Sequence, residues 1–174
     1  MIIDVNSPLP NESINNVEPW TSYHKGYLLR IFQIVENFKN YPNLLGFFGG
    51  NELINDLPTG KIDPPYIRAV TRDLKNYIAK HADREIPVGY SAADVREILV
   101  DSFNYLQCGT NGNDDDPSRI DFYGINSYSW CGDATFDSSG YDDIVADFAK
   151  TTIPVFFSGK QDIHNLYHLT NTKL

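Results

Sequence analysis

The stretch 44–56, with the sequence "LLGFFGGNELIND", decides the fold. Residues 44–50 form a continuous run of apolar residues and glycines, and Asn51 and Glu52 follow this run directly. A short apolar run between turn signals is typical of a β-strand that is buried on both faces, as in a parallel sheet. We therefore predict a strand over 44–50 with an amide and a carboxylic acid at its C-terminal end.

The same alternation of helix and strand patterns extends in both directions from this stretch. Apolar residues recur at helical spacing over 23–39 and again over 64–81, where two prolines open the helix. Short helices are predicted over 94–103 and 141–150. Further strands are predicted at residues 1–5, 86–90, 121–127 and 153–158. Five strands separated by helices predict a row of parallel βα units.

Two architectures contain such a row, an open doubly wound sheet and a (β/α)8 TIM barrel. An open sheet that binds a nucleotide usually has a glycine-rich first turn, and the sequence has neither G-x-G-x-x-G nor a P-loop. Polar residues instead follow the strands: Asp4 and Asn6, Asn51 and Glu52, Tyr90 and Ser91, Asn126 and Tyr128. Active sites of TIM barrels are built at this C-terminal end of the strands. The prediction is an α/β fold, a partial TIM barrel over 1–158, although about five strands are too few to close a barrel.

The composition argues against several classes of partner. The 174 residues include 14 Lys plus Arg and 23 Asp plus Glu, a net charge of −9, which repels nucleic acid and anionic membrane surfaces. No apolar stretch approaches roughly 18 residues, so no transmembrane segment is expected. Residues 1–10, "MIIDVNSPLP", lack a basic start and a long apolar region, so we expect no signal peptide. Aromatic residues form 13% of the chain and suit either a protein core or packing against sugar rings.

Histidines, cysteines and a glycosylation sequon add little specific chemistry. The four histidines form no cluster with metal-ligand spacing at strand ends, so neither a metal nor another cofactor is expected. Cys108 and Cys131 are too few for a disulfide framework, although they could pair with each other. Asn11 opens the sequon Asn11-Glu12-Ser13, which matters only if the chain is secreted.

Glu52 at a strand end beside Asn51 suits the hydrolysis or transfer of glycosides. The acid can protonate the oxygen of the glycosidic bond that breaks, while the amide hydrogen-bonds a sugar hydroxyl beside the reacting carbon. The alternative is that Glu52 only caps or charges a loop, because an isolated Asn-Glu pair is weak evidence. The pattern alone leaves both interpretations open.

Five longer motifs, in chain order, resemble one family. They are "NYPNLLGFFGGNELIND" (40–56), "IPVGYSAAD" (86–94), "DFYGINSYSWCG" (121–132), "SSGYDDIVADF" (138–148) and "IPVFFS" (153–158). Together they closely resemble the catalytic domain of fungal β-1,3-glucanosyltransferases of glycoside hydrolase family 72, over about residues 1–158. The resemblance implies an extracellular TIM-barrel transglycosidase that is glycosylated, GPI-anchored to the plasma membrane or cell wall, and cuts and rejoins cell-wall β-1,3-glucan.

The resemblance also implies roles for four residues. Glu52 matches the family's general acid/base, and Asn51 matches the asparagine that contacts the reacting sugar. Tyr128 matches a tyrosine beside the catalytic carboxylates, and Asp4 matches an aspartate of the substrate groove. For Tyr128 and Asp4, strand-end packing and helix capping remain the alternatives.

The chain departs from the family after Ser158. The family continues with a glutamate that acts as the nucleophile, and Gly159 stands in its place here. A retaining mechanism needs two carboxylates roughly 5–5.5 Å apart, and the next acid, Asp162, lies too far along the chain to replace the missing one. We therefore expect 159–174 to be a divergent tail and the chain to be inactive in transfer.

Other expected parts of the family are not found in this sequence. The resemblance implies disulfides of Cys108 and Cys131 with partners that are absent here, and it implies further barrel strands, a signal peptide and an anchor signal. A fragment, a truncated gene product and a degenerate copy all fit this pattern. Three functions stay open: a transglycosylase of β-1,3-glucan, a non-catalytic remnant that binds glucan, and a chain too incomplete to fold stably because its sheet edges are exposed.

Overall fold

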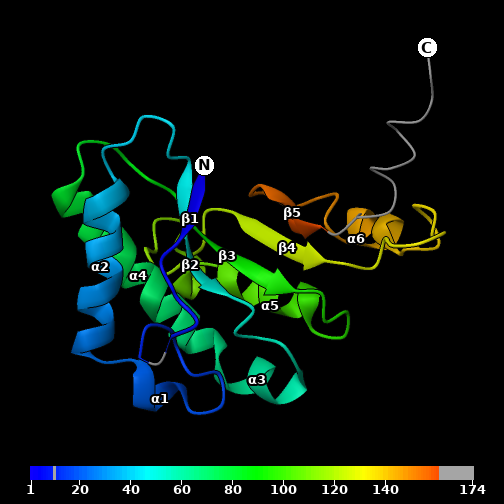
Figure 1. Ribbon diagram of the computed structural model, residues 1–174, viewed down its shortest axis with the longest axis horizontal. Coiled ribbons are helices and arrows are strands. Elements are labelled where there is room, and N and C mark those ends of the chain that lie inside the picture. The colour runs from blue at the N-terminus through cyan, green and yellow to red at the C-terminus, as the bar shows by residue number, and fades with distance from the viewer. Residues whose placement is uncertain (10, 161–174) are drawn as a thin grey trace.

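The computed structural model describes residues 1–9 and 11–160, which contain one five-stranded sheet (Figure 1). The strands are β1 (Ile2–Asp4), β2 (Gly46–Asn51), β3 (Val88–Ala93), β4 (Tyr123–Ser127) and β5 (Val155–Lys160). They lie in the order β1-β2-β3-β4-β5, and every neighbouring pair is parallel. The prediction of parallel strands, adjacent in chain order in one sheet, is confirmed.

The predicted starts of β2, β3, β4 and β5 are each two residues early, and a proline directly precedes two of these strands. Pro87 lies directly before β3, and Pro154 lies directly before β5. A proline has no N–H to donate to the neighbouring strand, but its carbonyl still accepts, here from Phe47 N and Tyr123 N at 2.9 Å each. The prolines therefore fix where these two hydrogen-bonded ladders begin.

β5 runs past its predicted end and pairs with β4 over this extension. The strand includes Gly159, which the predicted division assigns to the divergent tail. The rest of that tail, including Asp162, lies outside the described residues. The division into a barrel over 1–158 and a tail over 159–174 stays a prediction.

One or two α-helices of the described residues lie between each pair of consecutive strands. They are α1 (Pro19–Ser22), α2 (Lys25–Phe38), α3 (Leu57–Ile62), α4 (Pro64–His81), α5 (Leu99–Gln107) and α6 (Tyr141–Asp147). α2, α4 and α6 lie where the sequence predicts helices, whereas the short helices α1 and α3 have no predicted counterpart. None of these helices is long and apolar enough to cross a membrane.

α5 begins five residues later than the sequence pattern predicts, at Leu99 instead of residue 94. Asp94 accepts a hydrogen bond from Ser127 Oγ at 2.6 Å and pairs with the guanidinium of Arg96. These contacts tie the segment after β3 to the end of β4. The segment therefore stays a loop at the edge of the sheet instead of starting the helix.

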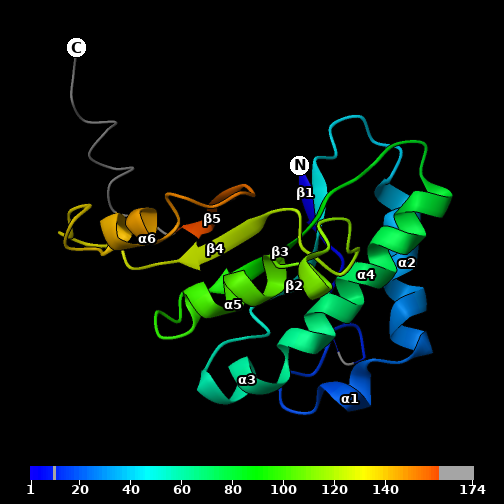
Figure 2. The same cartoon turned by 180° about the vertical axis from the view of Figure 1, so that it is seen from behind.

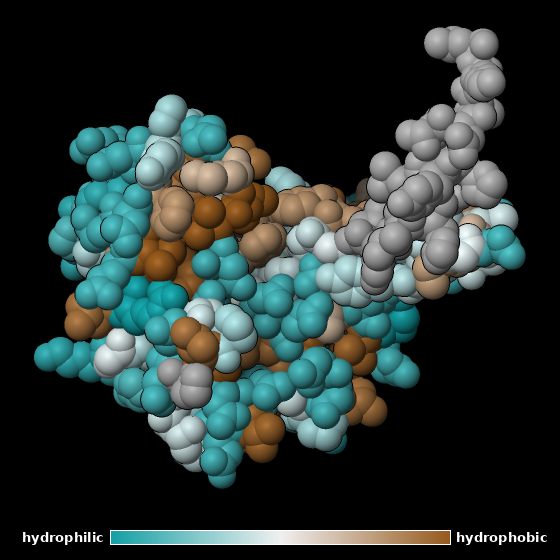
Figure 3. Space-filling view, in the orientation of Figure 1, coloured by the Kyte–Doolittle hydropathy of each residue, from teal (hydrophilic) through white to brown (hydrophobic). Residues whose placement is uncertain are grey.

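Helices cover one face of the sheet, and a cluster of three phenylalanine rings lies on the other face. α4 and α5 lie against one face, seen from behind in Figure 2, where Tyr123 of β4 packs against Phe103 of α5. Strand residues alternate between faces, so Phe48, Phe122 and Phe156 share the other face, with ring centroids 5.4–6.5 Å apart. Figure 3 shows hydrophobic surface over the sheet in the orientation of Figure 1. The sheet is therefore half of a barrel whose inner wall carries aromatic rings.

Asp63, directly before α4, is fully buried, and neither of its carboxylate oxygens has a hydrogen-bond partner among the described residues. Burial, and to a lesser extent the charge of Asp56, raises the pKa of Asp63 to about 7. The folded state then holds a proton that the unfolded state releases between about pH 4 and pH 7. The stability that this group contributes is full below about pH 4 and is lost as the pH rises through about 7.

We expect Asp63→Asn to raise the free energy of unfolding by roughly 1–4 kcal/mol at about pH 8 and to change it little at about pH 4. The neutral amide removes a buried charge while it keeps the size of the side chain. Urea unfolding at both pH values measures the difference, and Asp83→Asn, which alters an exposed carboxylate, is the control. Equal effects of Asp63→Asn at the two pH values would contradict the raised pKa of Asp63.

Candidate active site

Two β-bulges lie near the C-terminal ends of the strands, where an extra residue in one strand turns the next side chain. From Phe48 to Asn51, β2 has one residue more than the stretch of β3 that pairs with it. β5 gains one residue relative to β4 just before Gly159. The bulges turn Asn51 and Gly159 toward the space around Asn126 of β4.

Asn126 joins the predicted site residues through its side-chain amide. Its Nδ2 donates to Glu52 Oε1 at 2.8 Å and to Asn51 Oδ1 at 3.0 Å, and the residue is buried. Its Oδ1 accepts from Ser158 Oγ at 2.8 Å and from Ser91 Oγ at 3.1 Å. The reverse orientation of the amide would set an oxygen against the Glu52 carboxylate, so the hydrogen bonds fix its direction.

Glu52 has a left-handed backbone conformation with φ of 50°, which residues other than glycine rarely adopt away from functional sites. Its N–H donates to Ser91 O at 2.8 Å, and the N–H of Ile54 donates to the Tyr90 hydroxyl at 2.9 Å. Tyr90 is fully buried beneath this turn, and burial raises its pKa, so the hydroxyl stays neutral. A Cβ at position 50 would lie 3.2 Å from the Tyr90 ring, so Gly50 lets the turn lie close to the ring.

Gly159 faces the same space as Glu52. A Cβ built on Gly159 would meet the hydroxyl of Tyr128 and would lie 2.8 Å from Asn126 Oδ1. The nitrogen of the same amide contacts Glu52, so a side chain at position 159 would point across Asn126 toward that carboxylate. The structure thus brings Glu52, Asn51, Tyr128 and Gly159 together at one edge of the sheet. Their catalytic and binding roles stay predictions.

Asp4 also lies at the C-terminal end of its strand, β1, which is one of the two edge strands of the described sheet. The N–H and Nδ2 of Asn6 donate to Asp4 Oδ1 at 2.9 and 3.0 Å, and Asn6 Nδ2 also donates to Gly49 O at 3.2 Å. Desolvation by the surrounding protein raises the pKa of Asp4 and outweighs the opposing hydrogen bonds from Asn6, although Asp4 borders solvent. The described contacts join Asp4 to β2 through Asn6 and do not join it to Glu52.

The cysteines and the sequon asparagine are exposed to solvent. Cys108 and Cys131 are exposed and free, so the structure does not form a disulfide between them. Partners for either cysteine elsewhere in a longer chain stay a prediction. Asn11 is exposed in a loop, with a left-handed φ of 63°, so a glycan attached to it would point into solvent without disturbing the core.

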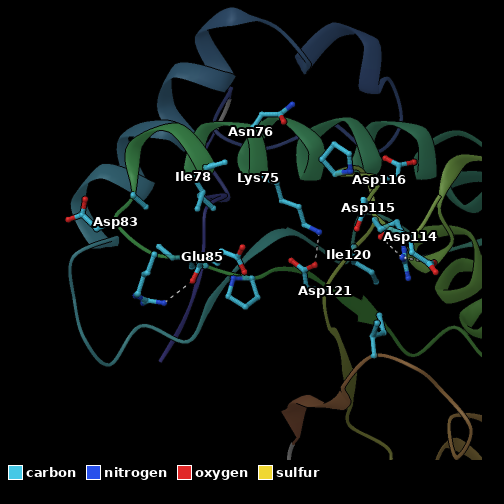
Figure 4. Close-up of a pocket in the computed structure, with 18 residues that line it drawn as sticks. Lys75, Asn76, Ile78, Asp83, Glu85, Asp114, Asp115, Asp116, Ile120 and Asp121 are labelled. Atoms are coloured by element: carbon cyan, nitrogen blue, oxygen red, sulfur yellow. Dashed lines mark hydrogen bonds and ion pairs between the residues drawn. The ribbon is translucent and has the colours of Figure 1, made fainter.

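A cavity of about 890 Å³ lies at the opposite edge of the sheet, as Figure 4 shows. It is lined by the second half of α4 and by the loops that lead into β3 and β4. Two ion pairs lie in its lining, because Lys75 pairs with Asp121 at 2.6 Å and Arg119 pairs with Asp114 at 2.9 Å. Active sites of barrels form at the C-terminal edge of the strands, so we place the candidate site at Glu52 and not in this cavity.

The sequence matches the family profile of glucanosyltransferases, glycoside hydrolase family 72, over residues 1–161. It is 51% identical over 158 residues to 1,3-beta-glucanosyltransferase gel2 of Aspergillus fumigatus. It is 53% identical over 164 residues to the probable 1,3-beta-glucanosyltransferase GAS3 of Saccharomyces cerevisiae. These similarities cover 91% and 90% of this chain but only 32% and 31% of the two relatives.

The structure is similar to that of Saccharomyces cerevisiae Gas2p in complex with laminaripentaose, with a TM-score of 0.80 and 36% sequence identity. It is equally similar to Gas2p in complex with laminaritriose and laminaritetraose. Each match covers 94% of this chain and 35% of Gas2p, so the chain spans about a third of the length of the relatives that it matches. On this sequence match and this fold, the chain belongs to the glucanosyltransferase family, glycoside hydrolase family 72.

Proposed function

We propose that this chain binds β-1,3-glucan oligosaccharides at the site around Glu52 and performs no transglycosylation on its own. The observation that carries the proposal is the Asn126 amide, which holds the Glu52 carboxylate on one side and faces Gly159 on the other. One of the two groups that a retaining transglycosidase needs is in place. The position opposite it has no side chain.

Glu52 is the candidate general acid and base. In a retaining mechanism such a residue protonates the glycosidic oxygen as the bond breaks, and it later takes a proton from the acceptor hydroxyl. The hydrogen bond from the side-chain Nδ2 of Asn126 fixes the direction of the Glu52 carboxylate. Asn51 presents a second amide beside it, which suits a hydrogen bond to a hydroxyl of the same sugar.

The second carboxylate of a retaining enzyme attacks the anomeric carbon and holds the glycosyl group covalently. Gly159 has no atom that can attack, and the Tyr128 hydroxyl lies in front of it. The nearby Ser158 hydroxyl donates to Asn126, and its hydrogen-bond partners among the described residues, Asn126 and Ser91, are not bases that could activate it. The site therefore supports binding of the glucan chain without formation of a covalent intermediate.

The ligand class follows from the relatives and from the aromatic surface. Gas2p binds laminari-oligosaccharides, which are short β-1,3-glucans. The half-exposed ring of Tyr128 suits the apolar face of a sugar. We also infer that the whole protein acts outside the cell, GPI-anchored at the fungal cell wall, and the exposed sequon at Asn11 is compatible with that setting.

Isothermal titration calorimetry with laminaripentaose tests the proposal, and cellopentaose, which is β-1,4-linked, is the control ligand. We expect saturable binding of laminaripentaose with a dissociation constant of roughly 1 mM or below and weaker binding of cellopentaose. Asn126→Ala should weaken binding about tenfold, because it releases both Asn51 and Glu52. Glu85→Gln, at the opposite edge of the sheet, should leave binding unchanged. No saturable binding, or no effect of Asn126→Ala, would contradict the proposal.

The alternative of a chain that cannot fold stably rests on the edges of the sheet. Within the described residues, β1 and β5 each have a neighbour on one side only. A cooperative transition in a far-UV circular dichroism melt would favour the folded, glucan-binding chain. A gradual loss of signal without a transition would favour the alternative.

A further inference from the structure

We infer that this chain joins glucan chains when the donor is an activated α-glycosyl fluoride, an activity of the glycosynthase type. The donor is a laminari-oligosaccharide whose reducing-end carbon carries fluorine in the α configuration, and the acceptor is a second laminari-oligosaccharide. The inference rests on the proposed function, because the same site must bind the glucan. The structure contributes a placed carboxylate, Glu52, across from a position without a nucleophile, Gly159.

The α-fluoride replaces the step that Gly159 cannot perform. In a retaining mechanism on a β-linked sugar, the nucleophile attacks from the α face and leaves the sugar α-linked to the protein. An α-glycosyl fluoride has the same configuration at the same carbon, and fluoride leaves without the help of an acid. Only the second half of the reaction remains, in which a hydroxyl of the acceptor attacks that carbon.

The atoms and charges of this step balance without another reagent. The acceptor oxygen forms a bond to the anomeric carbon while the carbon–fluorine bond breaks. Fluoride leaves with the electron pair of that bond, and the proton of the acceptor hydroxyl goes to the Glu52 carboxylate, from which solvent removes it. The products are a longer β-linked oligosaccharide, fluoride and a proton.

Glu52 is held in a position to take this proton. Its Oε1 accepts from Asn126 Nδ2 at 2.8 Å, which fixes the direction of the carboxylate. The other carboxylate oxygen has no hydrogen-bond partner among the described residues, so it remains available to the acceptor hydroxyl. The left-handed turn at Glu52 and the hydrogen bond from its backbone N–H to Ser91 O hold the backbone that carries this carboxylate.

The fluoride would leave toward Gly159. A Cβ at this position would meet the Tyr128 hydroxyl, so the Tyr128 side chain occupies the space in front of Gly159. Tyr128 is half exposed, and this step requires its side chain to turn toward solvent when the donor binds. Its O–H can then donate a hydrogen bond to the departing fluoride, in the way that fixed donors stabilise developing negative charge.

The lengthened product should accumulate. Its new bond is β-linked, and the retaining route to break such a bond needs a nucleophile at position 159. A complete transglycosidase would bind the product again and redistribute its sugars. Persistence of the product therefore distinguishes this activity from ordinary transfer.

The test incubates the 174-residue chain with α-laminaribiosyl fluoride as donor and laminaripentaose as acceptor. A fluoride electrode measures release, and mass spectrometry measures the products. We expect release about a hundredfold above the protein-free rate and products that are two sugars longer than the acceptor. Glu52→Gln should return release to the protein-free rate, and Tyr128→Phe should lower it about tenfold without weakening the binding of laminaripentaose. Glu85→Gln, at the opposite edge of the sheet, should leave the rate unchanged.

Binding of laminaripentaose is measured on the same preparations, which separates the two proposals. Binding without fluoride release would overturn this inference and leave the proposed function standing. Absence of binding would overturn both. Fluoride release that survives Glu52→Gln would place the base elsewhere and would also overturn the inference.

Discussion

Glu52→Gln is expected to abolish transglycosylation in a chimera that completes the barrel around this chain. The chimera joins residues 1–158 to the remaining barrel segments of an active glucanosyltransferase, including the segment that carries that relative's own nucleophile. It should convert laminaripentaose into shorter and longer oligosaccharides, because Asn126 already holds Glu52 in place. A glutamine keeps the shape of the side chain but cannot protonate the leaving oxygen, so kcat should fall roughly 10²–10⁴-fold.

Mass spectrometry of the products over time measures this loss. Glu85→Gln makes the same chemical change on an exposed carboxylate at the opposite edge of the sheet, so it should leave the rate of the chimera unchanged. Full activity of the Glu52→Gln chimera would refute the role of Glu52. An unsubstituted chimera that folds and binds laminaripentaose but forms no products would show that this chain has lost a working acid and base.

Arg68→Met is expected to lower the free energy of unfolding by about 3–5 kcal/mol, because it removes one partner of a buried ion pair. Arg68 of α4 is buried, and its guanidinium anchors the segment that follows α5. Its partners, at 2.6–3.2 Å, are Tyr105 O, Cys108 O, Thr110 Oγ1, Asp116 Oδ2 and Ser118 Oγ. Methionine fills the space of the aliphatic stem but leaves these acceptors without their donor.

Urea unfolding at about pH 7 measures this effect, and Arg72→Met, at an exposed ion pair on the same helix, should cost less than about 1 kcal/mol. Hydrogen bonds from Thr110 and Ser118 hold the pKa of Asp116 below its ordinary value. The stability that Asp116 contributes is therefore present above about pH 4 and is lost as the pH falls further. Equal costs of the two arginine substitutions at about pH 7 would refute the anchoring role.

The parallel sheet was predictable because its signal is local. Consecutive apolar residues, as in 44–50, indicate a strand that is buried on both faces. Apolar residues at helical spacing indicate the helices between the strands. The two bulges were not predictable in this way, because a register shift depends on how strands far apart in the chain pair. The bulges matter for the site, since they turn Asn51 and Gly159 toward Asn126.

The same limit applies to the candidate site. Glu52 and Asn51 were found from their place at a strand end, and Tyr128 and the vacant position 159 were found through the family resemblance. Asn126 occupies a strand end too, but its partners come from three other strands, and no local pattern reports such a network. The left-handed backbone at Glu52 was not predictable for a similar reason, because hydrogen bonds to Tyr90 and Ser91 of β3 hold that turn.

The most direct test of the account compares two complete-barrel chimeras that differ only at position 159. One chimera keeps residues 1–160 of this chain, with Gly159, and the other carries the substitution Gly159→Glu. The measurement is the yield of transfer products from laminaripentaose, by mass spectrometry, after both chimeras are shown to bind it. The account predicts transfer products from the Gly159→Glu chimera alone, because only that chimera can form the covalent intermediate. Transfer products from the chimera that keeps Gly159 would contradict it.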